Sequence, residues 1–172
     1  MKEYVSRTVS KMKTLFKKYS VYIISIGISL AISILSALIT MGKMSIMETL
    51  VKPPLSPPPA AFPIVWTILY ILMGISAAIV YKARSTDKKA ARSGLIVYAI
   101  SLAANFLWSV IFFNLEKYLF AFIWLLFLLS LIILTIVEYK KASWRAAFLQ
   151  IPYTIWVIFA GYLTFGIWLL NK

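Results

Sequence analysis

The stretch YLFAFIWLLFLLSLIILTIV (118–137) decides the fold class, because it is continuously apolar and contains no charged side chain. An α-helix needs about 20 apolar residues to cross the hydrocarbon core of a bilayer. A membrane-spanning β-strand needs only about 10 residues, and its side chains alternate between apolar and polar. This stretch does not alternate, so we expect a transmembrane helix here.

Similar stretches occur along the rest of the chain, so that the expected spans are about 21–41, 62–81, 94–114, 118–138 and 146–170. The chain has 172 residues, of which 62% are hydrophobic and 16% aromatic. This is more apolar surface than a soluble core of that size encloses. No long charged or Gly/Ser-rich linker separates the spans. The sequence predicts an all-α membrane protein, with a single bundle of five transmembrane helices over 21–172.

The net charge of +13 is distributed unequally between the two ends of the expected helices. Most of the basic residues fall in 1–20, 82–92 and 139–145, which successive crossings place on one side of the membrane. The other side holds only Lys43, Lys52, Lys117 and Lys172. The positive-inside rule then predicts a cytoplasmic N-terminus and a C-terminus outside. The basic excess indicates topology rather than nucleic-acid binding, and it favours a bacterial plasma membrane over a mitochondrial one.

Residues 1–20 are expected to form a basic extension before the first span. Apolar residues recur there at helical spacing, at Val5, Val9, Met12, Phe16 and Tyr19. This pattern is typical of a helix that lies on an anionic membrane surface, and a basic tail is the other interpretation. Small residues recur in the first span at Ser25, Ser29, Ser33 and Ala37. They predict a packing face, used either within the bundle or in a homodimer.

Several kinds of catalytic chemistry are excluded by composition. Cysteine and histidine are both absent, which removes thiolate and imidazole metal ligands and the commonest general base. Every lysine lies outside the expected spans, so no buried Ser–Lys pair is available. We therefore expect no metal site and no required cofactor, and the sequence does not favour an enzyme.

Aromatic residues share one face on three of the expected helices. The three sets are Trp66, Tyr70 and Met73; Asn105, Trp108 and Phe112; and Tyr153, Trp156 and Ala160. A pocket with aromatic walls and one amide suits a large flat apolar ligand such as a tetrapyrrole, and less specifically a sterol. The alternative is that these residues serve packing or the interfacial belt. Trp144 and Trp168 are better interpreted as interfacial anchors.

Three motifs in this chain resemble those of one known membrane-protein family. The proline-rich segment KPPLSPPPAAFPIVW (52–66), continuing as TILYILMG, resembles the family's entry into the second helix. Its prolines predict an ordered, extended or turning loop. LAANFLWSVIFF in the third span is similar to the Leu-Asn-x-x-Trp-x-x-x-Phe-Phe run, and IPYTIWVIFAGYL in the fifth is similar to Pro-Tyr-x-x-Trp-x-x-Phe-Ala. Together these motifs resemble the tryptophan-rich sensory protein/translocator protein family, and the resemblance covers about 43–171.

The resemblance implies a membrane receptor or sensor that binds porphyrins such as protoporphyrin IX. The porphyrin would be a ligand and not a cofactor. The resemblance also implies a homodimer. Sterol-like and benzodiazepine-type molecules are the other apolar ligands it implies. The candidate ligand-binding residues are Phe62, Trp66, Tyr70, Asn105, Trp108, Phe112, Phe120, Tyr153, Trp156 and Ala160. Trp66 and Trp156 sit at positions that the resemblance associates with light-dependent porphyrin degradation. The alternative function is an uncoupled porphyrin transporter or exporter, since no ionisable residue lies at mid-membrane to bind a coupling ion.

The sequence also departs from the family pattern. The family's tryptophan after the double proline falls at Ala60, and the usual acidic residue of the fourth span falls at Trp124. The arginine that follows Trp168 in animal members is Leu169, which breaks their cholesterol-consensus motif. We therefore expect the ligand preference to differ from that of animal members.

Overall fold

The computed structural model describes the backbone of residues 2–172 and the side chains of residues 19–172. Within these residues it contains helices and no β-strand. The elements are α1 (Lys2–Thr40), the 3-10 turn η1 (Met41–Lys43), α2 (Ile46–Thr49), α3 (Ala61–Ala83), α4 (Lys88–Ser109), the π-helical turn η2 (Val110–Asn114), α5 (Tyr118–Ala142), α6 (Trp144–Phe148) and α7 (Ile151–Leu170).

Five helical segments are long and apolar enough to cross a membrane, and they confirm the predicted all-α class. These segments are Tyr19–Lys43, Ala61–Ala83, Lys88–Asn114, Tyr118–Ala142 and Trp144–Leu170. The fifth differs from the expected continuous span, because the helix is interrupted at Leu149 and Gln150 between α6 and α7. Pro152 explains the interruption, since it lacks the N–H that would bond to the carbonyl of Phe148.

The predicted amphipathic face of 1–20 rests largely on side chains outside the described residues.

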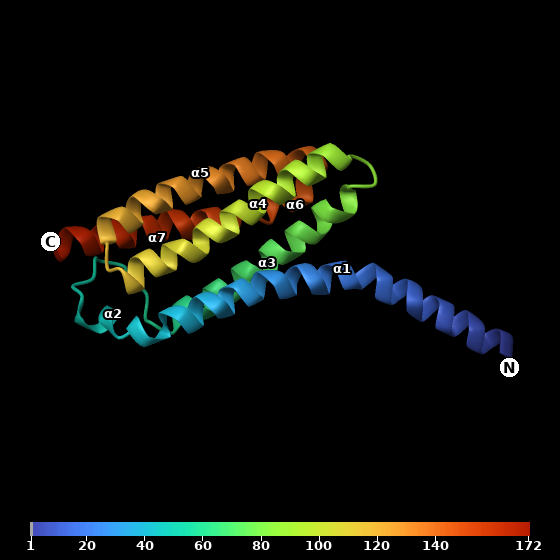
Figure 1. The fold of residues 1–172 in the computed structure, drawn as a ribbon, viewed down its shortest axis with the longest axis horizontal. Helices are drawn as coiled ribbons and strands as arrows, with labels where there is room; N and C mark the ends of the chain where they lie inside the picture. Colours follow the sequence, from blue (N-terminus) through green and yellow to red (C-terminus); the bar gives the residue numbers. More distant parts are fainter. Residues whose placement is uncertain (1) are drawn as a thin grey trace.

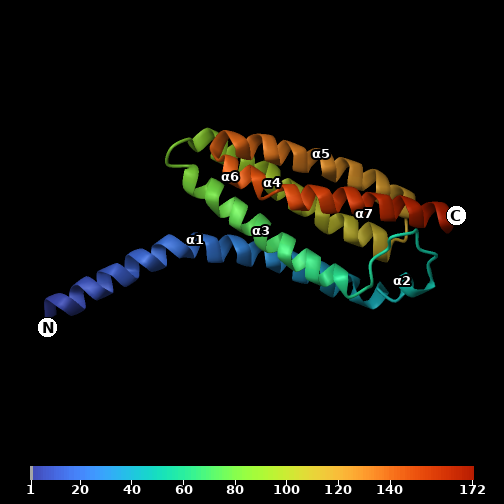
Figure 2. The same cartoon turned by 180° about the vertical axis from the view of Figure 1, so that it is seen from behind.

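The helices run side by side along a common axis (Figures 1 and 2). α4, α5 and α7 lie together, and α1 crosses alongside α3. The closest packing joins α4 to α5 and α1 to α3. The α3–α4 and α5–α6 turns meet at one end of the bundle, whereas α2, the proline-rich loop and the C-terminus lie at the other.

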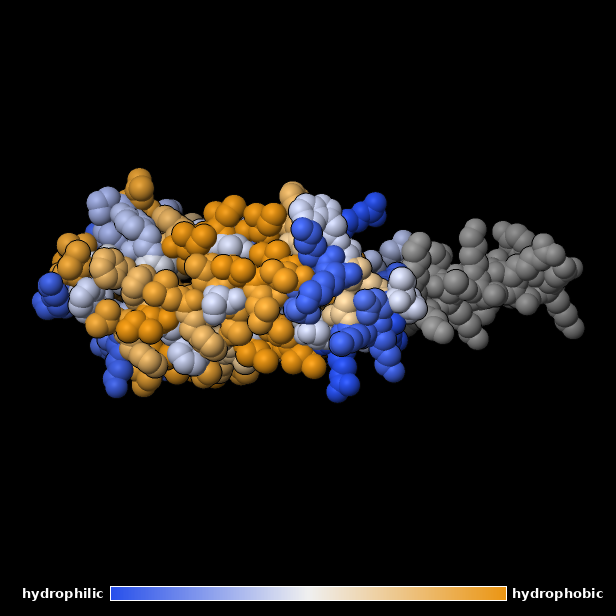
Figure 3. All heavy atoms as spheres, turned by 90° about the horizontal axis from the view of Figure 1, so that it is seen from above, coloured by the Kyte–Doolittle hydropathy of each residue, from blue (hydrophilic) through white to orange (hydrophobic). Residues whose placement is uncertain are grey.

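The two ends of the bundle differ in how many basic residues they carry. Figure 3 shows a broad apolar band along the bundle and a gathering of hydrophilic residues beside the α3–α4 turn. We call this the basic end, defined by Lys82, Arg84, Lys88, Lys89, Arg92, Lys140, Lys141 and Arg145. The opposite end, with α2, the proline-rich loop and the C-terminus, is called the loop end. Which end faces the cytoplasm stays a prediction.

The half of the bundle nearer the basic end is closely packed through small residues. A Cβ atom added to Gly74 would lie 2.5 Å from the Cα of Ile26 on α1. The hydroxyls of Ser29 and Tyr98 lie 2.8 Å apart and join α1 to α4. Ser29 is fully buried, so the small-residue face predicted for the first span is used at this level inside the bundle.

The interruption between α6 and α7 is held by hydrogen bonds to α3. The Ser76 hydroxyl donates to the carbonyl of Ala146 at 2.7 Å, and Gln150 Nε2 donates to the Ser76 oxygen at 3.2 Å. All three residues are buried. These bonds satisfy polar groups that apolar surroundings would leave unpaired, so α6 is held in a fixed position against the bundle.

Candidate ligand-binding site

Toward the loop end the helices enclose a cavity of about 580 Å³. Its walls come from α1, α3, α4, η2 and α7. Residues of α2 and of the proline-rich loop cover it at the loop end. This volume lies within the range of about 300–1,000 Å³ that small-molecule pockets occupy.

Trp66 on α3 is the centre of the aromatic wall. Its ring centroid lies 5.7 Å from that of Tyr70 and 6.4 Å from that of Trp108 on α4. Trp108 continues the wall to Phe112 of η2, at 5.6 Å. These separations are typical of interacting aromatic pairs. The aromatic faces predicted for the second and third helices therefore meet and line one cavity.

Asn105 contributes a buried amide group to this wall. Its side chain is 2% exposed, and Nδ2 donates to the Tyr70 hydroxyl at 2.9 Å. This amide therefore both joins α4 to α3 and lines the cavity. Tyr70 retains its hydroxyl hydrogen as a donor for a ligand.

Hydroxyl groups from α1 form a part of the lining that the sequence did not predict. Ser33, Ser36 and Thr40 contribute from α1. The Thr40 hydroxyl donates to the carbonyl of Ser36 at 2.9 Å. The serine pattern of the first span by itself predicts only a packing face. Its continuation to Ser36 and Thr40, near the end of the span, was the available signal.

The proline-rich loop follows a turning, non-helical path, and its N-terminal part is hydrogen-bonded to the last helix and to Asn171 just beyond it. The side chain of Asn171 both donates to the carbonyl of Val51 and accepts from its N–H, each at 2.9 Å. The Tyr162 hydroxyl donates to the carbonyl of Pro54 at 2.9 Å. Residues just beyond Val51 line the cavity, among them Lys52, Ser56, Pro57 and Pro59. The cover of the cavity is thus attached to the last helix.

Most of the predicted ligand-binding residues line the cavity: Phe62, Trp66, Tyr70, Asn105, Trp108, Phe112 and Ala160. Tyr153 and Trp156 do not. Their rings lie behind Trp66, with centroids 6.2 and 6.4 Å from its ring. They support the wall instead of forming its surface.

Unpaired polar groups surround Trp66. Trp108 Nε1, the Tyr153 hydroxyl and Trp156 Nε1 are buried and have no hydrogen-bond partner within the described part of the chain. All three rings are direct neighbours of Trp66. Buried donors of this kind are rare in packed interiors, so the surroundings of Trp66 differ from an ordinary apolar core.

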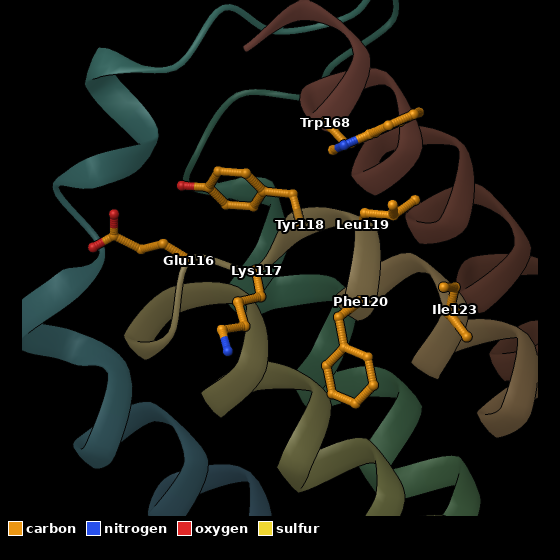
Figure 4. A pocket seen from close by; sticks show the side chains of 7 residues that line it. All are labelled: Glu116, Lys117, Tyr118, Leu119, Phe120, Ile123 and Trp168. Carbon is orange, nitrogen blue, oxygen red and sulfur yellow. The ribbon is translucent and has the colours of Figure 1, made fainter. Parts of the chain in front are cut away.

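Phe120 lies outside the cavity, which corrects its predicted placement. It is 46% exposed and lines a shallow surface hollow of about 420 Å³ between the start of α5 and the end of α7 (Figure 4). The physical reason is that α5 packs on α4 and α7 and supplies no residue to the cavity lining. Trp124 acts on the site indirectly, because its Nε1 donates to the carbonyl of Ala104, beside Asn105, at 2.7 Å.

The fold and the site together define a class: a membrane protein of five spanning helices with an aromatic cavity inside the bundle. Residues 25–169 match the model of the TspO/MBR family. The chain therefore belongs to the TspO/MBR family, as its three motifs predicted.

Relatives come from bacteria and from eukaryotes. "Tryptophan-rich protein TspO" of Chlorobaculum tepidum is 37% identical over 147 residues, covering 85% of this chain and 92% of the relative. The "Translocator protein homolog" of Schizosaccharomyces pombe is 39% identical, over 70% of this chain and 74% of its own. The "Translocator protein" of Ovis aries is 32% identical, over 72% and 73%.

Proposed function

We propose that this chain is a membrane receptor or sensor that binds porphyrins, with protoporphyrin IX as the representative ligand. The cavity bordered by Trp66, Tyr70, Trp108 and Phe112 is the observation that carries the proposal. A tetrapyrrole is flat, large and mostly apolar, so indole and phenyl rings supply contact area while Asn105 and Tyr70 supply orientation. Sterol-like and benzodiazepine-type ligands share the apolar character but make less use of the aromatic wall.

Charged side chains reach the cavity only from its cover, among the lining residues described. They are Glu48 of α2 and Lys52 of the proline-rich loop. Lys52 supplies a positive charge for the carboxylate of a ligand whose apolar part lies deeper. This arrangement supports a ligand that is apolar at one end and polar at the other, as protoporphyrin IX is, with its acid groups paired with Lys52 and held away from Glu48.

Binding is the core of the proposal, and photochemistry is an addition to it. Within the described residues no cluster of three or more acidic, His or Cys side chains could hold a metal ion. Trp66 lies on the cavity surface, so its indole would contact a bound porphyrin, and Trp156 lies one ring further away. A porphyrin excited by light would therefore be in direct contact with Trp66 and not with Trp156. We therefore assign Trp66 the larger share in any light-dependent degradation.

A titration in the dark tests the binding. Purified protein is titrated with protoporphyrin IX while tryptophan fluorescence is followed, for the wild type, Trp66→Phe and Trp156→Phe. We expect saturable quenching, with affinity lowered more by Trp66→Phe than by Trp156→Phe. The same samples are then illuminated, and porphyrin loss should slow in the same order. Absence of saturable quenching in the wild type would remove the porphyrin proposal.

Transport without ion coupling is the alternative, and some relatives carry the printed name translocator. Counterflow in proteoliposomes separates the two functions. A receptor binds porphyrin without speeding its passage across the bilayer, whereas a transporter accelerates exchange of labelled for unlabelled porphyrin. We expect exchange no faster than in protein-free vesicles.

We also propose that the basic end faces the cytoplasm of a bacterial plasma membrane, from the charge distribution alone. The chain has no cysteine, so single cysteines report sidedness cleanly. In intact cells a membrane-impermeant maleimide should label Glu116→Cys at the loop end and should not label Thr86→Cys in the α3–α4 turn. The reverse pattern would invert the topology.

A further inference from the structure

Within the described residues, the basic end carries more positive charge than its carboxylates neutralise. Of the two carboxylates there, Asp87 accepts the N–H of Ala90 at the start of α4, and Glu138 is paired with Lys141. Among residues 19–172, no other ion pair occurs. Lys88, Lys89, Arg92, Lys140 and Arg145 are all exposed and have no carboxylate partner in that range.

Close helix packing brings these cations onto one surface. Gly94 of α4 lies against Tyr139 of α5, so closely that an added Cβ would lie 2.8 Å from the tyrosine Cδ1 atom. The last turn of α5 therefore lies beside the first turns of α4, and both carry exposed basic residues at the same end of the bundle although they are far apart in sequence. We call the surface formed by Lys88, Lys89, Arg92, Lys140, Trp144 and Arg145 the basic corner.

Aromatic side chains place the basic corner at the edge of the apolar band. Trp144 is 62% exposed, and the Lys140 ammonium lies 5.4 Å from its ring centroid. Phe148, on the same short helix, is 59% exposed. On α3, the Arg84 guanidinium lies 3.7 Å from the ring centroid of Tyr81. Aromatic rings paired with cations at the edge of an apolar band are typical of the headgroup level of a bilayer.

The corner is also held rigidly. Ala146 and Ala147 of α6 are buried, and the hydrogen bond from Ser76 fixes α6 on α3. The backbone that carries Trp144 and Arg145 therefore loses little further freedom when a ligand binds.

We propose that the basic corner is a binding site for an anionic diacyl phospholipid. The headgroup phosphate lies among the cations of α4 and of the α5–α6 turn, and an acyl chain covers Trp144 and Phe148. A soluble polyanion would neutralise the same charges but would leave those two aromatic side chains without a partner. This proposal is independent of the porphyrin site.

The test uses the full chain in nanodiscs and measures lipid preference. Brominated phosphatidylglycerol and brominated phosphatidylcholine are compared as quenchers of tryptophan fluorescence, in otherwise equal mixtures. We expect wild-type protein to prefer phosphatidylglycerol about fivefold, a factor that one well-placed basic side chain supplies at a membrane surface. Arg92→Gln/Lys140→Gln/Arg145→Gln should lose most of this preference. Equal quenching by the two lipids in the wild type would overturn the proposal.

A matched variant separates a site from net charge. Lys43→Gln/Lys117→Gln/Lys172→Gln removes the same number of charges from the loop end and should retain the preference. An equal loss in both variants contradicts a localised site. If the first variant fails to fold, the wild type alone still tests the proposal. Its preference for phosphatidylglycerol must then fall as the salt concentration rises. Sodium tripolyphosphate added to phosphatidylcholine nanodiscs should not raise the unfolding temperature as phosphatidylglycerol does, and an equal rise would contradict a lipid ligand.

Discussion

The two halves of this bundle use the same helices in opposite ways. Near the basic end, Gly74 and Gly94 let helices approach until backbone and side chain touch. Near the loop end, Trp66, Trp108 and Phe112 pack on one another and line a cavity of about 580 Å³ inside the bundle. Small residues thus give close packing, whereas large rings hold the helices further apart and line the space that remains inside the bundle. Stability and ligand binding are therefore expected to respond to different substitutions.

The largest effect on stability is expected at Gly74. In Gly74→Ala the new Cβ would lie 2.5 Å from the Cα of Ile26, and backbone cannot yield as a side chain can. We expect the free energy of unfolding to fall by about 3 kcal/mol, as for severe overpacking of a core. Thermal unfolding in detergent, followed by tryptophan fluorescence, measures the change.

Gly27 provides the matched control on α1. A Cβ added there meets no atom within 4 Å, so Gly27→Ala should be neutral or slightly stabilising through helix propensity. Equal destabilisation by both substitutions would show that the glycines act through helix flexibility and not through close packing.

A smaller effect is expected from the hydroxyl of Tyr98. Tyr98→Phe removes the 2.8 Å hydrogen bond to Ser29, and bonds between membrane helices contribute on average about 0.6 kcal/mol. Tyr139 is the control, because its buried hydroxyl has no partner in the described structure. Tyr139→Phe should leave the unfolding temperature unchanged or raise it. A larger loss for Tyr139→Phe than for Tyr98→Phe would contradict the hydrogen-bond assignment.

The smallest effect on stability is expected at the loop end, where the cover is attached. Asn171→Ala removes both hydrogen bonds to Val51, which are exposed and therefore contribute little to folding. The change should appear in kinetics, because residues that follow Val51 line the cavity. We expect porphyrin association and dissociation to accelerate together, by a few fold, in stopped-flow quenching. Lys172→Ala, which leaves those bonds intact, should not change either rate.

The fold was predictable because each span is long, apolar and free of charge. The exception was the interruption at Leu149 and Gln150, although Pro152 was visible in the sequence. Proline is tolerated inside membrane helices when neighbours satisfy the freed groups. Its effect here depended on Ser76 and Gln150, whose contact is long-range.

The site was only partly predictable, for a geometric reason. Helical spacing shows which residues share a face, but not which neighbour that face meets. Trp66 and Trp108 pack together on the cavity wall, whereas Trp156 shares its predicted face yet lies behind Trp66. Phe120 was included through resemblance alone, and the packing of α5 places it on the surface. The contribution of the loop and of α1 depended on tertiary contacts such as that between Asn171 and Val51.

Filling the cavity tests the central claim most directly. Ala160 lines the cavity on α7, so Ala160→Phe should place a ring in the space proposed for the porphyrin. In the dark titration we expect its affinity for protoporphyrin IX to fall at least about tenfold, a loss of about 1.4 kcal/mol, with little change in unfolding temperature. Ile158→Phe adds the same ring to an exposed position of the same helix and should bind as the wild type does. Undiminished binding by a folded Ala160→Phe protein would show that the ligand lies elsewhere.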